Sequence, residues 1–187
     1  QAQTTSEMNG VVMQIITAEN VAVADNPHGV DVRHLYTTPH VVVSQITLEP
    51  GEVLYREGAE GSSVFFVVQG SLDVSARNDA GADVLLRTAR DGEVLSEASF
   101  LTGLPRYATA TARETSNLLE LDHNALAPIA RKHRPLADAL NRLYEERVLT
   151  TALARSRVFG VLPEAERKAL GQRLTTVPVQ PGTAVVK

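Results

Sequence analysis

The 187-residue chain contains no cysteine, which excludes a disulfide framework and any thiolate chemistry. Basic residues are not in excess either, because 18 Lys and Arg stand against 22 Asp and Glu, for a formal net charge of -4. Nucleic-acid-binding surfaces carry clustered positive charge, so we expect no nucleic-acid partner. No apolar run approaches the ~20 residues of a membrane-spanning helix. We therefore expect a cytoplasmic protein without a membrane segment.

Signatures of several catalytic classes are also missing. The sequence has no Gly-x-Ser-x-Gly nucleophile elbow and no Walker-type phosphate loop. Its five histidines include no close pair with metal-ligand spacing, although a zinc or iron site from His28, His34 and His40 stays conceivable. We expect a protein that is not an enzyme and that holds no metal or cofactor.

Short apolar runs separated by turn residues dominate the first two thirds of the chain. The hydrophobic content of 43% is enough for a real core, and the length suits one domain or one and a part. Residues 1–9 are polar and are expected to be loose. The runs that predict strands are residues 11–16, 41–48, 84–87, 108–112 and 117–121.

Helical patterns follow the last predicted strand. A helix is expected to begin at Asp122, and Pro135 suits the first turn of a second helix that extends to Ala154. Leu136, Leu140, Leu143, Val148 and Leu149 form an apolar stripe along this second helix. The stripe predicts a helix that packs on the preceding strands.

Residues 92–108 are the stretch with the most specific chemistry. Glu97 and Arg106 stand nine positions apart, on either side of a short apolar piece. Ser96 can cap a short helix there, Gly103 can end it and Pro105 prevents its continuation. The first N–H groups of such a helix and the guanidinium suit a phosphate, while a carboxylate that only accepts hydrogen bonds suits a sugar hydroxyl. A surface ion pair around an ordinary helical turn is the alternative explanation of the same spacing.

Residues 96–108 resemble the phosphate-binding cassette of cyclic-nucleotide-binding domains, which reads Gly-Glu, a short helix, then Pro-Arg-x-Ala. The resemblance implies that Glu97 binds the ribose 2′-hydroxyl and Arg106 the cyclic phosphate of cAMP or cGMP. Ser96 and Tyr107 stand where the family usually has Gly and a small residue, and both crowd the phosphate. The ligand-binding residues implied are Ser96, Glu97, Ala98, Ser99, Arg106, Tyr107 and Ala108, with Leu140, Leu143 and Tyr144 as candidates for a lid over the base.

The stretch from Pro50 to the cassette is similar to the β roll of the same family. Glycines at positions 51, 58, 61 and 70 would turn the corners between short antiparallel strands, and residues 78–81 look like a hairpin tip. The fold class expected is mainly β, a double-stranded β-helix or jelly roll of cyclic-nucleotide-binding type with C-terminal helices. The resemblance implies a regulatory module that transmits a conformational change, with a possible homodimer through the helix from Pro135.

Two other functions stay open. The stretch 21–52 is similar to the start of small cupins, which are also jelly rolls, so a cupin-type metal-dependent enzyme is one alternative. Tyr55, Arg56 and Glu57 stand where the cupin metal site needs a His-x-His pair and a Glu. The second alternative is a ligand-free roll that serves as an interaction domain.

An internal repeat defines the expected end of the domain. Residues 177–187 echo residues 46–56, and residues 157–170 look like the entry helices of another such domain. We expect an extension over residues 1–20, the roll with its helices over 21–155, and the truncated start of a second domain over 156–187. Packing of the last segment onto the first roll is the alternative. A trimmed fragment is expected, or a processed chain.

Overall fold

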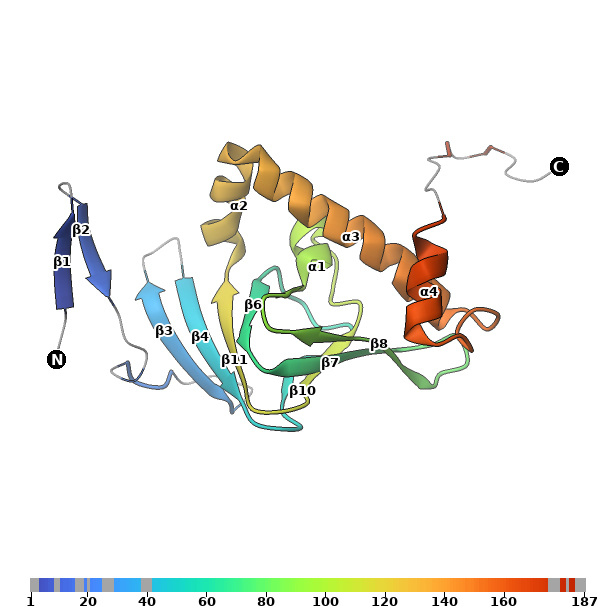
Figure 1. Cartoon of the computed structure of the whole chain (residues 1–187), viewed down its shortest axis with the longest axis horizontal. Helices are drawn as coiled ribbons and strands as arrows, with labels where there is room; N and C mark the ends of the chain where they lie inside the picture. The colour runs from blue at the N-terminus through green and yellow to red at the C-terminus, as the bar shows by residue number, and fades with distance from the viewer. Residues whose placement is uncertain are drawn as a thin grey trace.

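A computed structural model shows two antiparallel sheets that face each other, with helices over one end (Figure 1). It describes residues 4–8, 11–15, 19, 21–24, 29–37, 42–174, 179–180 and 182–183. The strands are β1 Thr4–Met8, β2 Val11–Ile15, β3 Asp31–Thr37, β4 Val42–Leu48, β5 Val53–Tyr55, β6 Val64–Gln69, β7 Ser71–Arg77, β8 Asp83–Arg90, β9 Val94–Leu95, β10 Thr109–Ala112 and β11 Ser116–Leu121. The helices are α1 Glu97–Thr102, α2 His123–Lys132, α3 Arg134–Arg155 and α4 Glu164–Gly171.

The two sheets form the predicted roll. One sheet has the strand order β5-β10-β7-β8 and the other has the order β3-β4-β11-β6-β9, with every neighbouring pair antiparallel. Side chains alternate between core and surface along β4, where Ser44, Ile46 and Leu48 are buried and their neighbours are less so. The mainly β fold with C-terminal helices is thus confirmed.

The core is divided between the inside of the roll and the space under the helices. Leu48, Val67, Leu72 and Leu118 are fully buried between the sheets. A second, smaller cluster forms where α2 and α3 cover the roll, and it contains Val64, Phe100, Leu126, Ala127 and Leu140. The helices are therefore part of the same folded unit as the strands.

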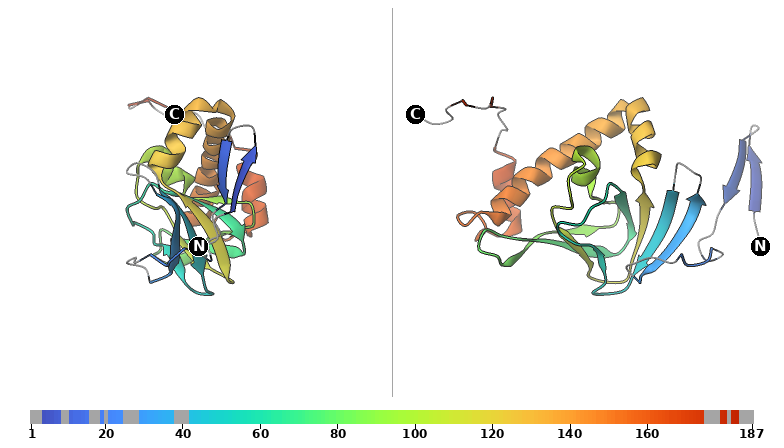
Figure 2. Two further views of the ribbon diagram at one scale, coloured as in Figure 1. Left: turned by 90° about the vertical axis from the view of Figure 1, so that its left-hand side faces the viewer. Right: turned by 180° about the vertical axis from the view of Figure 1, so that it is seen from behind.

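Most predicted strands match the structure within a few residues, but the N-terminal expectation was wrong in part. Residues 4–8 form β1 and pair in register with β2, whereas the polar composition predicted a loose segment over residues 1–9. This hairpin lies beside the roll (Figure 2). Strand β3 was also missed, because residues 31–37 mix charged and apolar side chains.

One turn glycine is required by close packing as well as by its dihedral angle. Gly70, between β6 and β7, has φ 98°, and a Cβ atom there would come within 2.4 Å of the Ser116 hydroxyl. Only glycine meets both conditions without displacing the start of β11. The predicted role of Gly70 as a corner of the roll is confirmed.

The helices begin where the sequence indicated. The Asp122 carboxylate caps α2 by accepting a hydrogen bond from the amide of Ala125, and Pro135 lies in the first turn of α3. In the described part of the chain, no helix combines the length and the apolar character needed to cross a membrane.

The segment after α3 turns back toward the roll. Helix α4 packs beside α3, and the buried Arg167 donates hydrogen bonds to the carbonyls of Leu162 and Leu85, the latter in β8. Much of the predicted repeat, namely residues 177–178, 181 and 184–187, lies outside the described residues. The start of a second domain at residue 156 stays a prediction.

Candidate functional site

The cassette, residues 96–108, connects β9 to β10 and places α1 between the roll and α3 (Figure 1). The expected side-chain cap at Ser96 is not present: its hydroxyl makes no cap hydrogen bond, and its backbone is left-handed with φ 71° and ψ 18°. Ser96 is the one non-glycine residue with positive φ among those the structure describes. The chain turns sharply from β9 into α1 there, so Ser96 adopts a conformation that glycine adopts without strain.

Glu97 is the most buried charged side chain of the cassette, with none of its surface exposed. Its Oε2 accepts a hydrogen bond from Nη1 of Arg147, which lies in α3 and also donates to the Val94 carbonyl at 2.8 Å. Its Oε1 is buried and has no hydrogen-bond partner. A buried acceptor without a donor costs about 1–3 kcal/mol, so a hydroxyl or amide that reached Oε1 would recover that free energy.

The end of the cassette is fixed to the loop before β6. Gly103 ends α1 in the left-handed conformation, as predicted, and its amide donates to the Ser99 carbonyl. The backbone of Arg106 then exchanges hydrogen bonds with the loop, donating to Ala59 at 2.9 Å and accepting from Gly58 at 2.8 Å. These bonds set the direction of the Arg106 side chain.

The Arg106 guanidinium is buried with 5% of the residue exposed. Its Nη1 donates to the Ser63 carbonyl at 3.0 Å, and the group lies over the rings of Tyr55 at 5.1 Å and Phe65 at 5.5 Å. Burial lowers the pKa of Arg106, and nearby Tyr55 and Glu120 oppose that change. The spacing did not predict this aromatic surrounding, because Tyr55 and Phe65 come from β5 and β6.

Glu97 and Arg106 line two different cavities. The cassette cavity, of about 280 Å³, lies between α1 and α3 and is lined by Glu97, Ala98, Ser99 and Tyr107 together with Tyr144 and Arg147. The seam cavity, of about 750 Å³, is lined by Arg106 and by residues of β3, β4, β5 and the loop 56–63. The sequence placed the carboxylate and the guanidinium at one pocket, and in this conformation they do not share one.

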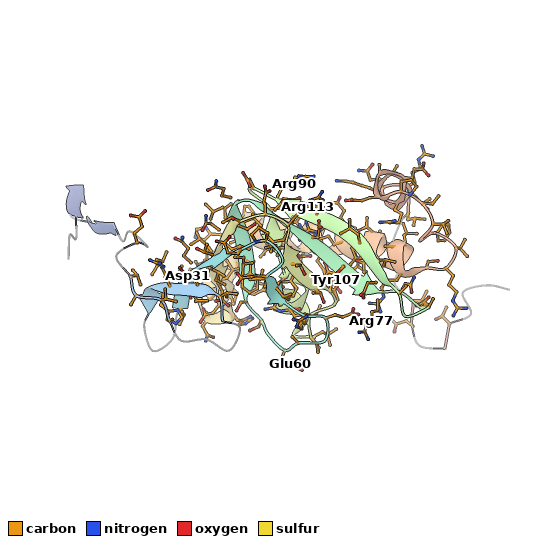
Figure 3. The ribbon with its side chains drawn as sticks, turned by 90° about the horizontal axis from the view of Figure 1, so that it is seen from below. Asp31, Glu60, Arg77, Arg90, Tyr107 and Arg113 are labelled. Atoms are coloured by element: carbon orange, nitrogen blue, oxygen red, sulfur yellow. The ribbon has the colours of Figure 1, made fainter. Side chains whose placement is uncertain are left out.

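Tyr107 and Ala108 both face inward. Tyr107 packs against the core of the roll and also borders the cassette cavity, and Figure 3 shows it among the strands. Burial raises the pKa of Tyr107, and Glu97 and Tyr55 raise it further. Ala108 is 1% exposed and belongs to the roll core, so its side chain contributes packing.

The lid residues divide between different surroundings. Tyr144 lines the cassette cavity, whereas Leu140 lies one turn closer to α2 and is buried with Phe100 and Leu126 instead. Leu143 lines a small polar cavity near β8. The sequence did not identify Arg147 and Val148 as site residues, although both line the cassette cavity. They lie three and four residues after Tyr144 in the same helix. That helical spacing was a signal that could have identified them.

The alternative metal site gains no support. No cluster of three His, Asp or Glu side chains suited to a metal occurs within the described part of the chain. The ring Nδ1 of His34 is hydrogen-bonded to the Ser44 hydroxyl at 2.9 Å, and His28 and His40 lie outside the described residues.

Comparison with known proteins finds one family whose members match both the roll and the cassette. The family described as "Cyclic nucleotide-binding domain" matches residues 45–133, which run from within β4 through β11 to the end of α2 and include the cassette. Residues 45–133, which carry most of the roll and the whole cassette, are thus similar to this family. The cupin alternative is not supported.

This chain spans less than half the length of each of three similar proteins. It is 26% identical over 152 residues to a cAMP-dependent protein kinase regulatory subunit of Blastocladiella emersonii, covering 81% of this chain and 36% of the relative. It is 27% identical over 144 residues to patatin-like phospholipase domain-containing protein 6 of Pongo abelii, covering 74% of this chain but 10% of the relative. The regulatory subunit of a cAMP-independent protein kinase A from Trypanosoma brucei has the same fold, with a TM-score of 0.50 and 22% sequence identity. The alignment covers 68% of this chain and 41% of that subunit.

Proposed function

We propose that the chain is a regulatory module that binds cAMP or cGMP at the cassette and passes the binding event to α3. The observation that carries this proposal is the unpartnered Oε1 of the fully buried Glu97, at the edge of the cassette cavity. A ribose hydroxyl donates the hydrogen bond that this oxygen lacks. The family match over residues 45–133 and the relation to a cAMP-dependent kinase regulatory subunit support the same ligand class.

The phosphate is proposed to bind Arg106 after a local rearrangement. The guanidinium now donates to Ser63 on the side of the seam cavity, and the Tyr107 ring packs between the roll and the cassette cavity. Binding would require the ring to move so that the guanidinium reaches the cyclic phosphate. The first-turn amides of Ala98 and Ser99, which have no acceptor inside α1, would complete the phosphate contacts.

Helix α3 is the proposed element of transmission. Arg147 connects it to Glu97, while Tyr144 and Val148 bring an aromatic and an apolar side chain to the cassette cavity, where a base would lie. A ligand that contacts both α1 and α3 stabilises the conformation in which they are close. Its differential affinity for that conformation is the free energy available to an attached domain.

Further parts of the proposal concern the whole protein. We assign the chain a regulatory and not a catalytic role, in the cytoplasm, with cAMP or cGMP as ligand and no other cofactor. A homodimer through α3 is also proposed, as the family resemblance implies. Sedimentation with and without cyclic nucleotide tests the homodimer.

Calorimetry with cAMP, cGMP and AMP tests the central proposal. We expect saturable heat with one of the two cyclic nucleotides and weaker binding in Arg106→Gln and Glu97→Gln. Charge-assisted hydrogen bonds contribute about 1.5–3 kcal/mol, so each loss should be about ten- to a hundredfold. Arg113→Gln, at an exposed arginine outside the cassette, serves as the matched control and should bind as the wild type does.

A ligand-free interaction role is the second candidate, favoured by the packing of Tyr107 against the roll core. Tyr107→Ala distinguishes the two, since it removes the ring from the cassette without removing Glu97 or Arg106. Tighter nucleotide binding in this variant supports the sensor. The absence of heat with either cyclic nucleotide, in both the wild type and Tyr107→Ala, would show that the sensor proposal is wrong.

A further inference from the structure

The seam cavity lies where the two sheets of the roll are not joined by hydrogen bonds. Strand β3 is the edge of the five-stranded sheet and β5 is the edge of the four-stranded sheet, and both contribute lining residues. The loop 56–63 lines the cavity as well. Its volume of about 750 Å³ falls within the range of small-molecule sites, ~300–1,000 Å³.

Apolar side chains form much of the interior of this cavity. Val32 and Ile46 come from the five-stranded sheet, Leu54 from β5 and Phe65 from β6, and each is at most 8% exposed. These groups offer no hydrogen bond to a sugar hydroxyl or a base, so they favour a hydrocarbon or aromatic body.

Arg106 is the buried charge in this apolar surrounding. Its guanidinium makes one side-chain hydrogen bond to the described part of the protein, from Nη1 to Ser63, and no ion pair with a carboxylate there. The nitrogens Nε and Nη2 make no hydrogen bond to the described residues and keep some accessible surface, and Arg106 lines the cavity. A guanidinium with two unused donor positions matches a carboxylate in a bidentate geometry.

Other charged groups around the cavity select the kind of anion. Glu52, Glu60 and Glu120 all line it, as do Arg56 and His34, and Figure 3 shows Glu60 on the outer side of the loop. The three carboxylates outnumber the two arginines, and they disfavour a doubly charged phosphate more than a singly charged carboxylate. We propose that the seam cavity is a second ligand site, distinct from the cassette cavity, that takes a small carboxylic acid with an apolar body on Arg106.

This site shares only Arg106 with the proposed cyclic-nucleotide site. Glu97 and α3 contribute nothing to its lining, and the cassette contributes Arg106 alone. A failure of cAMP and cGMP to bind would therefore leave the inference standing, and a failure of the acid to bind would leave the nucleotide proposal standing.

NMR titration of the whole 187-residue chain with sodium octanoate tests the inference. We expect saturable, one-to-one shift changes at the methyl groups of Val32, Ile46 and Leu54. Arg106→Gln should weaken octanoate binding tenfold or more. Val32→Phe should block binding by filling the cavity, while Val148→Trp, which fills the cassette cavity instead, should leave octanoate affinity unchanged.

Several results would overturn the inference. They are the absence of saturable shifts at millimolar octanoate, shifts centred on Tyr144 and Val148, or equally strong shifts at Val32 with inorganic phosphate. The shift map of the wild type decides the matter even if Val32→Phe does not fold. Octanoate binding that persists in a folded Val32→Phe variant would also contradict the proposed location.

Discussion

At the residue scale, Ser96 shows that the cassette keeps its backbone path when a side chain replaces the usual glycine. Its φ of 71° places a Cβ atom in a conformation that costs about 1–2 kcal/mol for ordinary residues. The neighbouring contacts of Glu97 and the packing of α1 must compensate for that strain. The backbone conformation of Ser96 is thus set by the connection between β9 and α1 and not by the intrinsic preference of serine.

Replacement of Ser96 by glycine should therefore stabilise the protein. We expect Ser96→Gly to raise the free energy of unfolding by about 1 kcal/mol, because glycine adopts the left-handed conformation without strain. Urea unfolding measures the change. Ser99→Gly is the matched control: Ser99 is equally buried but lies inside α1, where glycine should be destabilising. Equal losses in both variants would show that Ser96 is not strained.

The sequence predicted the cassette well and its surroundings poorly. Glu97, Gly103 and Arg106 are close in sequence, so local spacing and resemblance were sufficient to locate the turn, the helix and its end. Arg147 is 50 positions from Glu97, and their contact depends on how α3 lies across α1. Similarly, the separation of Glu97 and Arg106 into two cavities depends on the packing of Tyr107, which no local pattern encodes.

At the element scale, the buried pair of Glu97 and Arg147 holds α3 against α1. The carboxylate is fully buried and 8% of Arg147 is exposed, so water screens their attraction little. Removal of one partner leaves the other charge buried without compensation. The pair therefore makes the position of α3 sensitive to what happens at the cassette.

A double-mutant cycle between α1 and α3 measures this coupling. We expect Glu97→Gln and Arg147→Met each to lower the free energy of unfolding by about 3 kcal/mol. The double variant should lose less than the sum, with a coupling of about 1–3 kcal/mol. The exposed pair of Arg134 and Asp138 within α3 is the control, with an expected coupling below about 0.5 kcal/mol. Additive losses at the buried pair would contradict the proposed attachment.

At the scale of the whole molecule, buried tyrosines connect stability to alkaline pH. Burial raises the pKa of Tyr55 and of Tyr107 above the usual value near ~10. The folded state keeps both phenols neutral, whereas the unfolded state ionises them as the pH rises past ~10. Their contribution to stability is thus complete below about pH 10 and decreases as the pH rises from there toward the folded-state pKa values.

The pH dependence of unfolding by urea tests this expectation. The free energy of unfolding should fall more steeply with pH above ~10 in the wild type than in Tyr107→Phe. Phenylalanine keeps the packing of the ring and cannot ionise, so the two proteins should have similar stability at pH 7. Identical pH profiles would indicate that Tyr107 ionises in the folded state as readily as in the unfolded one.

The overall fold was predictable because its signals are repeated along the chain. Turn residues around Gly51, Gly58 and Gly70 separate short apolar runs, and each run becomes a strand of the roll. Strands β1 and β3 lack such runs, because their charged and polar side chains resemble those of loops, whereas β2 was predicted from its apolar run. Their pairing depends on neighbouring strands and not on their own composition.

Helix α3 is attached to the roll by two arginines that are eight positions apart. Arg147 reaches Glu97, and Arg155 reaches Glu57 at 3.4 Å in the loop after β5. Eight residues rise about 12 Å, so the two attachments together fix the tilt of the helix. Release of Arg147 alone would leave Arg155 as a pivot, and the end of α3 that carries α2 would swing farthest. Helix α4 follows α3 close to this pivot. A segment attached after α4 would therefore be rotated relative to the roll, while its distance from the roll would change little.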